Sequence, residues 1–198
     1  DWFSGVDWSQ DVRMKLTASA QIKHTARIVD LDRVRGQHLV RIYEEARVEA
    51  HKDLIKYRHN PLFIAGLMLY WGEGDKISKG GVRLTNTDPE LIRLYVVFLE
   101  RVCRVPRSKI RAGILIYPDL DPETCEKYWS TRSGVSRDRF VKTIAIPGRH
   151  KTRRLLHGVC IITVSSTYFK AKMIEWLRIF PQELMKKPYY ENIKNERI

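Results

Sequence analysis

The sequence lacks the features that mark membrane-spanning and disulfide-stapled proteins. No run approaches the roughly 18 consecutive apolar residues of a membrane-spanning helix, and no signal-peptide pattern opens the chain. The three cysteines, Cys103, Cys125 and Cys160, are odd in number and lack C-x-x-C spacing. They therefore predict reduced packing residues in a cytoplasmic protein, and neither a disulfide framework nor a zinc site.

The sequence is also short of acids. Its 198 residues carry 36 Lys and Arg against 23 Asp and Glu, a formal net charge of +13. Such an excess predicts an anionic partner, with nucleic acid ahead of an anionic membrane surface. No aromatic RNA-binding signature or known RNA-module motif is visible, so an RNA-directed enzyme has little support from the residues. We expect no membrane partner and no small-molecule substrate.

Charge and apolar pattern divide the chain into three expected parts. Residues 1–59 form a helical N-terminal extension, with one helix ending at Ile22 and a second over residues 30–57. Its charges nearly cancel, at 11 bases against 9 acids, whereas residues 61–198 hold 25 bases against 14 acids. The extension is either a packing or dimerising arm or a DNA-contacting helix. Residues 60–180 form the main domain, and residues 181–198 form a C-terminal tail.

The main domain begins with the segment NPLFIAGLMLYWGEGDK, residues 60–76. Asn60 can cap a helix and Pro61 suits its first position. The residues that follow are almost all apolar, which predicts a helix buried on most of its faces. Within it Ala65, Gly66 and Gly72 are small and lie about one and two turns apart, so that a second backbone can approach closely.

Glu73 stands between two glycines at the end of this helix, and Asp75 follows. A buried unpaired carboxylate costs several kcal/mol, so we expect Glu73 at a wet or metal-bearing edge. The alternative is a glycine helix cap that carries a solvated glutamate.

The segment AGLMLYWGEGDK, followed by the strand VRLTNTDP and an amphipathic helix, resembles the LAGLIDADG homing endonucleases. It is most similar to the bacterial single-motif type with an LYW(A/G)EG sequence. The resemblance implies an α+β fold in which a saddle-shaped antiparallel sheet carries helices on one face. It also implies a homodimer with two motif helices side by side, and an acid that binds a divalent metal at the scissile phosphate. That acid falls on Glu73, two residues later than in the family and Glu in place of Asp.

Two functions are consistent with the resemblance. The first is sequence-specific, magnesium-dependent cleavage of double-stranded DNA, with Mg²⁺ held by Glu73 and Asp75 and with Glu73 and Lys142 as catalytic residues. The alternative is a non-catalytic DNA-binding protein or transcription regulator on a degenerate LAGLIDADG fold, which the late Glu favours. In both, the residues implied at the dimer interface are Ala65, Gly66, Leu69 and Gly72.

After the motif the pattern predicts alternating strands and helices. Two helices begin at the repeated Asp-Pro-Glu, which suits a capped helix start. On the first of them, the expected buried side comprises Leu91, Leu94, Val97, Phe98 and the stem of Arg101. The expected elements are a strand over 82–86, a helix over 88–105, a strand over 109–117, a helix over 121–134, two antiparallel strands over 140–146 and 159–165, and a helix over 167–180.

Basic residues concentrate between the last two strands. Residues 137–154 contain seven Lys and Arg against one acid, Asp138. Clustered like charges repel, so this segment predicts a phosphate-tracking surface, the alternative being a solvated loop. Within it His150 is a weak candidate general base. The family's saddle adds contacts from the free face of the sheet. The complete expected DNA-binding set is Lys76, Lys79, Arg83, Thr85, Arg111, Arg137, Arg139, Lys142, Arg149, Lys151, Arg153, Arg154 and Thr163.

Overall fold

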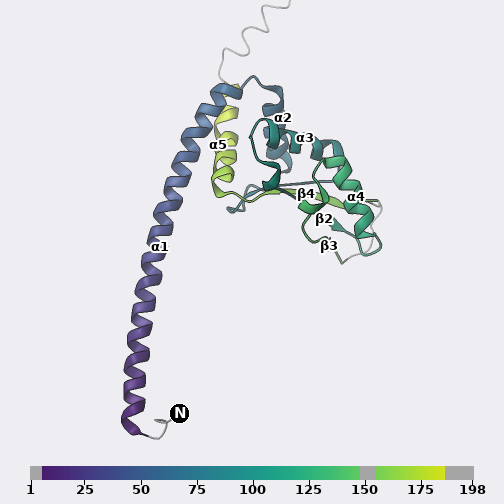
Figure 1. Ribbon diagram of the computed structural model, residues 1–198. Helices are drawn as coiled ribbons and strands as arrows, with labels where there is room; N and C mark the ends of the chain where they lie inside the picture. The colour runs from purple at the N-terminus through teal and green to yellow at the C-terminus, as the bar shows by residue number, and fades with distance from the viewer. Residues whose placement is uncertain (1–5, 148–154, 186–198) are drawn as a thin grey trace, which may run out of the picture. The chain divides into compact units, whose positions relative to one another are not determined.

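The computed structural model describes residues 6–147 and 155–185 and has an α+β architecture (Figure 1). It divides into two compact units, residues 1–44 and 45–198, and the boundary falls inside the first helix. None of the described helices is both long and apolar enough to cross a membrane.

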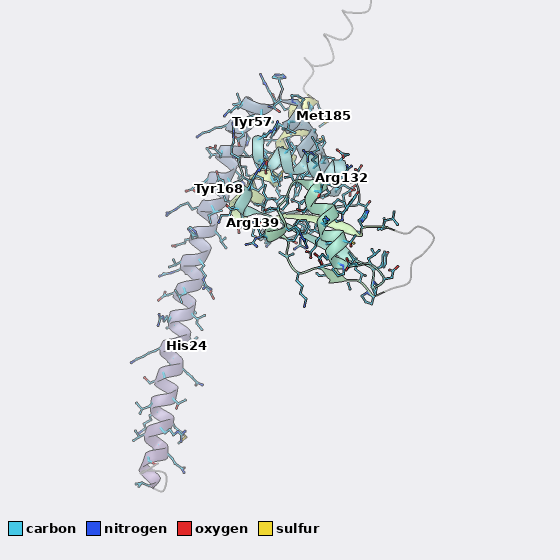
Figure 2. All side chains as sticks on the ribbon, turned by 45° about the vertical axis from the view of Figure 1, so that its right-hand side comes forward. His24, Tyr57, Arg132, Arg139, Tyr168 and Met185 are labelled. Atoms are coloured by element: carbon cyan, nitrogen blue, oxygen red, sulfur yellow. The ribbon has the colours of Figure 1, made fainter. Side chains whose placement is uncertain are left out.

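The first unit is one helical arm, not two helices. Helix α1 runs without a break over Asp7–Tyr57, so the predicted interruption after Ile22 is wrong. The sequence between the expected helices contains no Gly or Pro, and its Lys, Ala and Arg favour a helix. Asp30, where the second helix was expected to begin, pairs with Arg33 one turn later at 3.2 Å. His24 projects from the middle of this arm (Figure 2).

The second unit begins with the last turns of α1, which α5 (Thr167–Leu184) holds by polar contacts. The Trp176 indole donates to the Ala50 carbonyl at 3.2 Å, and the Lys172 ammonium pairs with Asp53 at 2.5 Å. Near the C-terminal end of α1, Ala46, Ala50 and Leu54 are buried. Leu31 and Val34, in the first unit, are exposed.

Four capped helices and four strands complete the second unit. Asn60, Asp88, Asp121 and Ser166 each accept hydrogen bonds from the first turn of their helix, as the sequence predicts. The remaining elements, in chain order, are α2 (Pro61–Glu73), β1 (Val82–Asn86), α3 (Pro89–Arg101), a 3₁₀ turn (Arg107–Lys109), β2 (Ile110–Ile116), α4 (Pro122–Ser133), a second 3₁₀ turn (Arg137–Arg139), β3 (Ile144–Ala145) and β4 (Val159–Val164).

The sheet is mixed, with strand order β1-β4-β2-β3. Strand β4 is antiparallel to both β1 and β2, while β3 is parallel to β2. The antiparallel pairing expected between residues 140–146 and 159–165 is therefore wrong. Helix α4 acts as the crossover that parallel neighbours require, because it returns the chain to the starting end of β2. Backbone bonds from Val141 to Ala112 and from Ile146 to Ile116, both 2.8 Å, then guide the chain along β2.

Helices α2, α3 and α5 lie on one side of the sheet (Figure 1). The sheet presents Leu84, Ala112 and Ile162 to them, and all three are buried. Phe63 packs edge-on against Trp176, with ring centroids 5.3 Å apart, and so joins α2 to α5. Among the described residues of the second unit no helix covers the opposite face, which we call the open face.

Helix α3 buries part of the side that its apolar spacing predicts, since Phe98 is fully buried and Leu91 and Val97 are half-buried. Ile92, Tyr95 and Leu99 are fully buried, whereas Leu94 is exposed. The reason is that α3 packs against both α2 and the sheet, which shifts its buried side away from Leu94. Its Phe98 ring lies directly over Gly66 of α2, where an added Cβ would come within 2.1 Å of the ring.

Gly66 therefore serves packing within one chain, and its expected place at a dimer interface is wrong. We predict that Gly66→Ala lowers the free energy of unfolding by about 1–3 kcal/mol, because the Phe98 ring must shift. Gly36→Ala, at a helical glycine of α1, is the control, since no atom lies within 4 Å of its added Cβ. It should be neutral or stabilising by up to about 1 kcal/mol. Urea unfolding of both variants checks this, and equal stabilities would contradict it.

Candidate nucleic-acid interface

The strand register gathers polar side chains on the open face. Thr163 of β4 lies opposite Arg83 of β1 on one side and Arg111 of β2 on the other. Neighbouring strands are about 4.8 Å apart, so the two arginines flank Thr163 at a mutual distance of roughly 10 Å. Thr85 lies two residues along β1, on the same face, opposite Ile161. All four of these polar residues belong to the DNA-binding set that the sequence analysis predicts.

A groove of about 400 Å³ lies over this row. Its polar rim comprises Arg83, Arg111, Lys142, Thr163 and Ser165, and its apolar floor comprises Leu115, Val141, Ile144 and Ile161. Four residues of the expected DNA-binding set thus meet in one concave surface.

The basic side chains of the groove are not ion-paired within the described chain. Arg83, Arg111 and Lys142 form no ion pair with any acid that the structure describes. The pKa of Asp138 is lowered by a hydrogen bond from the Ser136 side chain and by the nearby charges of Arg139 and Arg111. A polyanion entering the groove would therefore meet basic side chains that form no ion pair with a described acid.

Arg137 and Arg139 are used differently. The Arg137 guanidinium lies 3.5 Å from Glu123 and 3.9 Å from Glu126 of α4. Arg139 pairs with Asp138 at 3.1 Å and is marked in Figure 2. Neither lines the groove. These arginines fasten the second 3₁₀ turn, and their charges are partly neutralised within the protein.

The rest of the predicted basic segment lies outside the described residues. This applies to Arg149, Lys151, Arg153 and Arg154, and to His150.

Glu73 occupies the junction between α2 and the edge of the sheet. It is the last residue of α2 and is exposed. After it, the Gly74 amide donates to the Tyr70 carbonyl at 2.9 Å and the Asp75 amide to the Arg83 carbonyl at 2.9 Å. Within the described parts of the chain nothing pairs with the Glu73 carboxylate. It is therefore free to bind a ligand.

Asp75 has a structural task. One of its carboxylate oxygens, Oδ1, accepts the backbone amides of Ile77 at 2.9 Å and Ser78 at 3.1 Å. Hydrogen bonds from the Ser78 side chain and from these two amides lower the pKa of Asp75 to about 2. The carboxylate thus caps the turn between α2 and β1, and it is less available as the second metal ligand that the sequence suggested.

A buried lysine, which the sequence reading missed, anchors the same turn. Lys170 of α5 is only 4% exposed. Its ammonium donates to the Tyr70 hydroxyl at 2.8 Å and to the Asp75 carbonyl. Burial lowers the pKa of Lys170 and raises that of Tyr70. The available signal was a lysine between Phe169 and Met173 on a buried stripe, where lysine is rare unless it has partners.

Two further lysines lie near the end of α2. Lys76 donates its ammonium to the Trp71 carbonyl at 2.8 Å, and Lys79 lies exposed in the following turn. Cations at the C-terminal end of a helix stabilise it through the helix dipole. The C-terminal end of α2 carries the partial negative charge of the helix dipole and the Glu73 carboxylate. The ammonium groups of Lys76 and Lys170 offset both charges.

The structure does not bring Glu73 and Lys142 together. Gly74 bridges to Leu84 of β1, whereas the residue before Lys142 bonds to Ala112 of β2, and β4 lies between those strands. Lys142 of the same chain therefore belongs to the groove and not to the surroundings of Glu73.

The part of the chain that the structure describes contains no ready-made cluster of ligands for a metal ion. Among residues 6–147 and 155–185 no cluster of three or more His, Cys, Asp or Glu side chains could hold one. On α2, Ala65 and Leu69 are half-buried and Gly72 is exposed. These three expected interface residues leave one apolar side of α2 incompletely covered.

Comparisons with protein-family models, with curated proteins and with solved structures found no match. The resemblance to the LAGLIDADG proteins thus rests on the motif residues.

The turn cap predicts a pH dependence of stability. The pKa of Asp75 is lowered in the folded state, so its contribution is complete above the ordinary value of 3.8 and disappears as the pH falls toward 2. Wild type should therefore lose its advantage over Asp75→Asn between about pH 4 and pH 2. Urea unfolding at several pH values in this range checks the trend, and a difference that stays constant would contradict it.

Proposed function

We propose that the protein binds double-stranded DNA through the open face and cleaves it as a magnesium-dependent homodimer of the LAGLIDADG type. The observation that carries the proposal is the row of Arg83, Thr163 and Arg111 beside Lys142, on the side of the sheet that no described helix covers.

The dimensions of the row suit a duplex. The DNA major groove is about 12 Å wide and admits strands, and the two arginines stand roughly 10 Å apart. Arginine forms bidentate hydrogen bonds with guanine, while threonine offers a hydroxyl group and a methyl group to base edges. Lys142 supplies a phosphate contact at the rim. The surface therefore combines sequence reading with salt-dependent attraction.

The homodimer is supported by α2. Its side bearing Ala65, Leu69 and Gly72 is apolar and incompletely covered. Small residues at positions 65 and 72 permit a second helix to approach closely. A twofold arrangement of two α2 helices would also bring two Glu73 residues to one axis and match a pseudo-palindromic duplex.

The donor set suits magnesium when two chains contribute. Hard cations prefer oxygen ligands, and the Glu73 carboxylate has no competing partner in the described part of the chain. Two such carboxylates with nearby backbone carbonyls would hold the ion. When bound, the ion supplies phosphate polarisation and a more acidic water molecule. Lys76 and Lys79 would hold the phosphate beside the acids.

One observation favours the second candidate, a DNA-binding regulator without cleavage. Asp75 is committed to the turn and Lys142 lies across the sheet, so each chain presents Glu73 alone. Binding through the groove is common to both candidates, and only the role of Glu73 separates them.

We predict that Glu73→Gln abolishes magnesium-dependent nicking of supercoiled plasmid, by about a hundredfold or more, because charge stabilisation at the phosphate is lost. Salt-sensitive binding to a duplex should persist, since the groove is unchanged. Glu44→Gln, another exposed glutamate, is the control and should cut normally. Duplex binding without cleavage by wild type would select the regulator, and the absence of duplex binding would contradict both candidates.

A further inference from the structure

Ile77 is the most exposed large apolar side chain among the described residues, at 92%. It lies in the turn between α2 and β1, four residues after Glu73. Single exposed apolar residues are ordinary on protein surfaces. What distinguishes Ile77 is how its backbone is held and what surrounds it.

The turn that carries Ile77 is fixed at Asp75. The Ile77 amide donates to the Asp75 carboxylate, and the carbonyl of Asp75 accepts bonds from Tyr70 and from the buried Lys170. The Asp75 amide in turn bonds to the Arg83 carbonyl at the edge of the sheet. The side chain is therefore held out into solvent by a rigid support.

Cations flank this apolar tip. Lys76 precedes Ile77 and Lys79 follows two residues later, and both are exposed. Neither lysine pairs with an acid that the structure describes. The segment thus presents one branched apolar side chain between two positive charges, beside the candidate catalytic carboxylate.

We infer that Ile77 is a wedge that enters the base stack of a bound duplex next to Glu73. This inference rests on the proposed function. Proteins that bind the minor groove and kink DNA insert Phe, Leu, Ile, Met or Pro between base steps, and they contact that groove with Arg and Lys. Unstacking the step beside Glu73 would open the backbone there and bring a phosphate to the carboxylate. Ile77 then acts as a positioning residue, because it touches DNA but takes no part in the bond exchange.

The test uses a duplex with 2-aminopurine at central pyrimidine–purine steps, which kink most easily. The fluorescence of this base rises when it unstacks, and a donor–acceptor dye pair at the duplex ends reports bending. Wild type should raise the 2-aminopurine signal and shorten the distance between the ends. Ile77→Ser should lose both signals but keep salt-sensitive binding through the groove, and Ile77→Met should restore both. The matched control is Ile55→Ser, which alters another isoleucine, 74% exposed on α1, and should behave as wild type.

The outcomes separate the wedge from the proposed function. Equal unstacking by wild type and Ile77→Ser would overturn the wedge and leave DNA binding intact. Duplex binding without unstacking by wild type would do the same. A change of mass in light scattering caused by Ile77→Ser, with unstacking unaltered, would assign Ile77 to a contact between copies and overturn the wedge. No duplex binding by wild type would overturn both the wedge and the proposed function.

Discussion

The buried ammonium of Lys170 is the interaction on which the arrangement of the site depends. It joins α5 to the end of α2 through the Tyr70 hydroxyl, and to the turn before β1 through the Asp75 carbonyl. No carboxylate of a described residue lies within ion-pairing distance of it. A buried charge costs several kcal/mol unless hydrogen bonds compensate it, and the oxygen atoms at the end of α2 provide that compensation. The consequence is a rigid turn that fixes where Glu73 and Ile77 stand.

The two faces of the sheet differ in burial and in charge. One face is buried against α2, α3 and α5, where Phe98 fills the space that Gly66 leaves. The open face carries Arg83 and Arg111 with no acid paired to them in the described chain. Some basic residues outside this face are ion-paired, as Arg137 is with Glu123 and Glu126 of α4. The net charge of the chain therefore does not locate the proposed interface. The basic residues that have no acidic partner in the described chain indicate its position better.

The local parts of the structure could be predicted because their causes are local. Asn60, Asp88 and Asp121 each cap the first turn of a helix and so predict where it begins. The alternation along β1 and β4 places Arg83 and Thr163 on one face. The resemblance to the family's sheet had suggested four polar residues that line the groove, namely Arg83, Arg111, Lys142 and Thr163.

The errors concern long-range contacts. The parallel pairing of β3 depends on where α4 returns the chain, and the burial of Gly66 depends on a ring of α3. The pairing of Arg137 depends on acids of a different helix. The role of Lys170 depends on Tyr70, a hundred residues earlier in the chain. A periodic pattern in one segment contains no information about such partners, so neither the anchor nor the separation of Lys142 from Glu73 could be predicted.

The most direct test of the central claim is chemical footprinting of lysine and arginine side chains, read by mass spectrometry, with and without duplex DNA. The account predicts that Arg83, Arg111 and Lys142 lose reactivity when DNA is added. Lys127 and Arg132, exposed on α4 and outside the groove (Figure 2 marks Arg132), should remain reactive. Protection of the α4 residues, with the groove as reactive as before, would contradict the assignment of the open face to DNA.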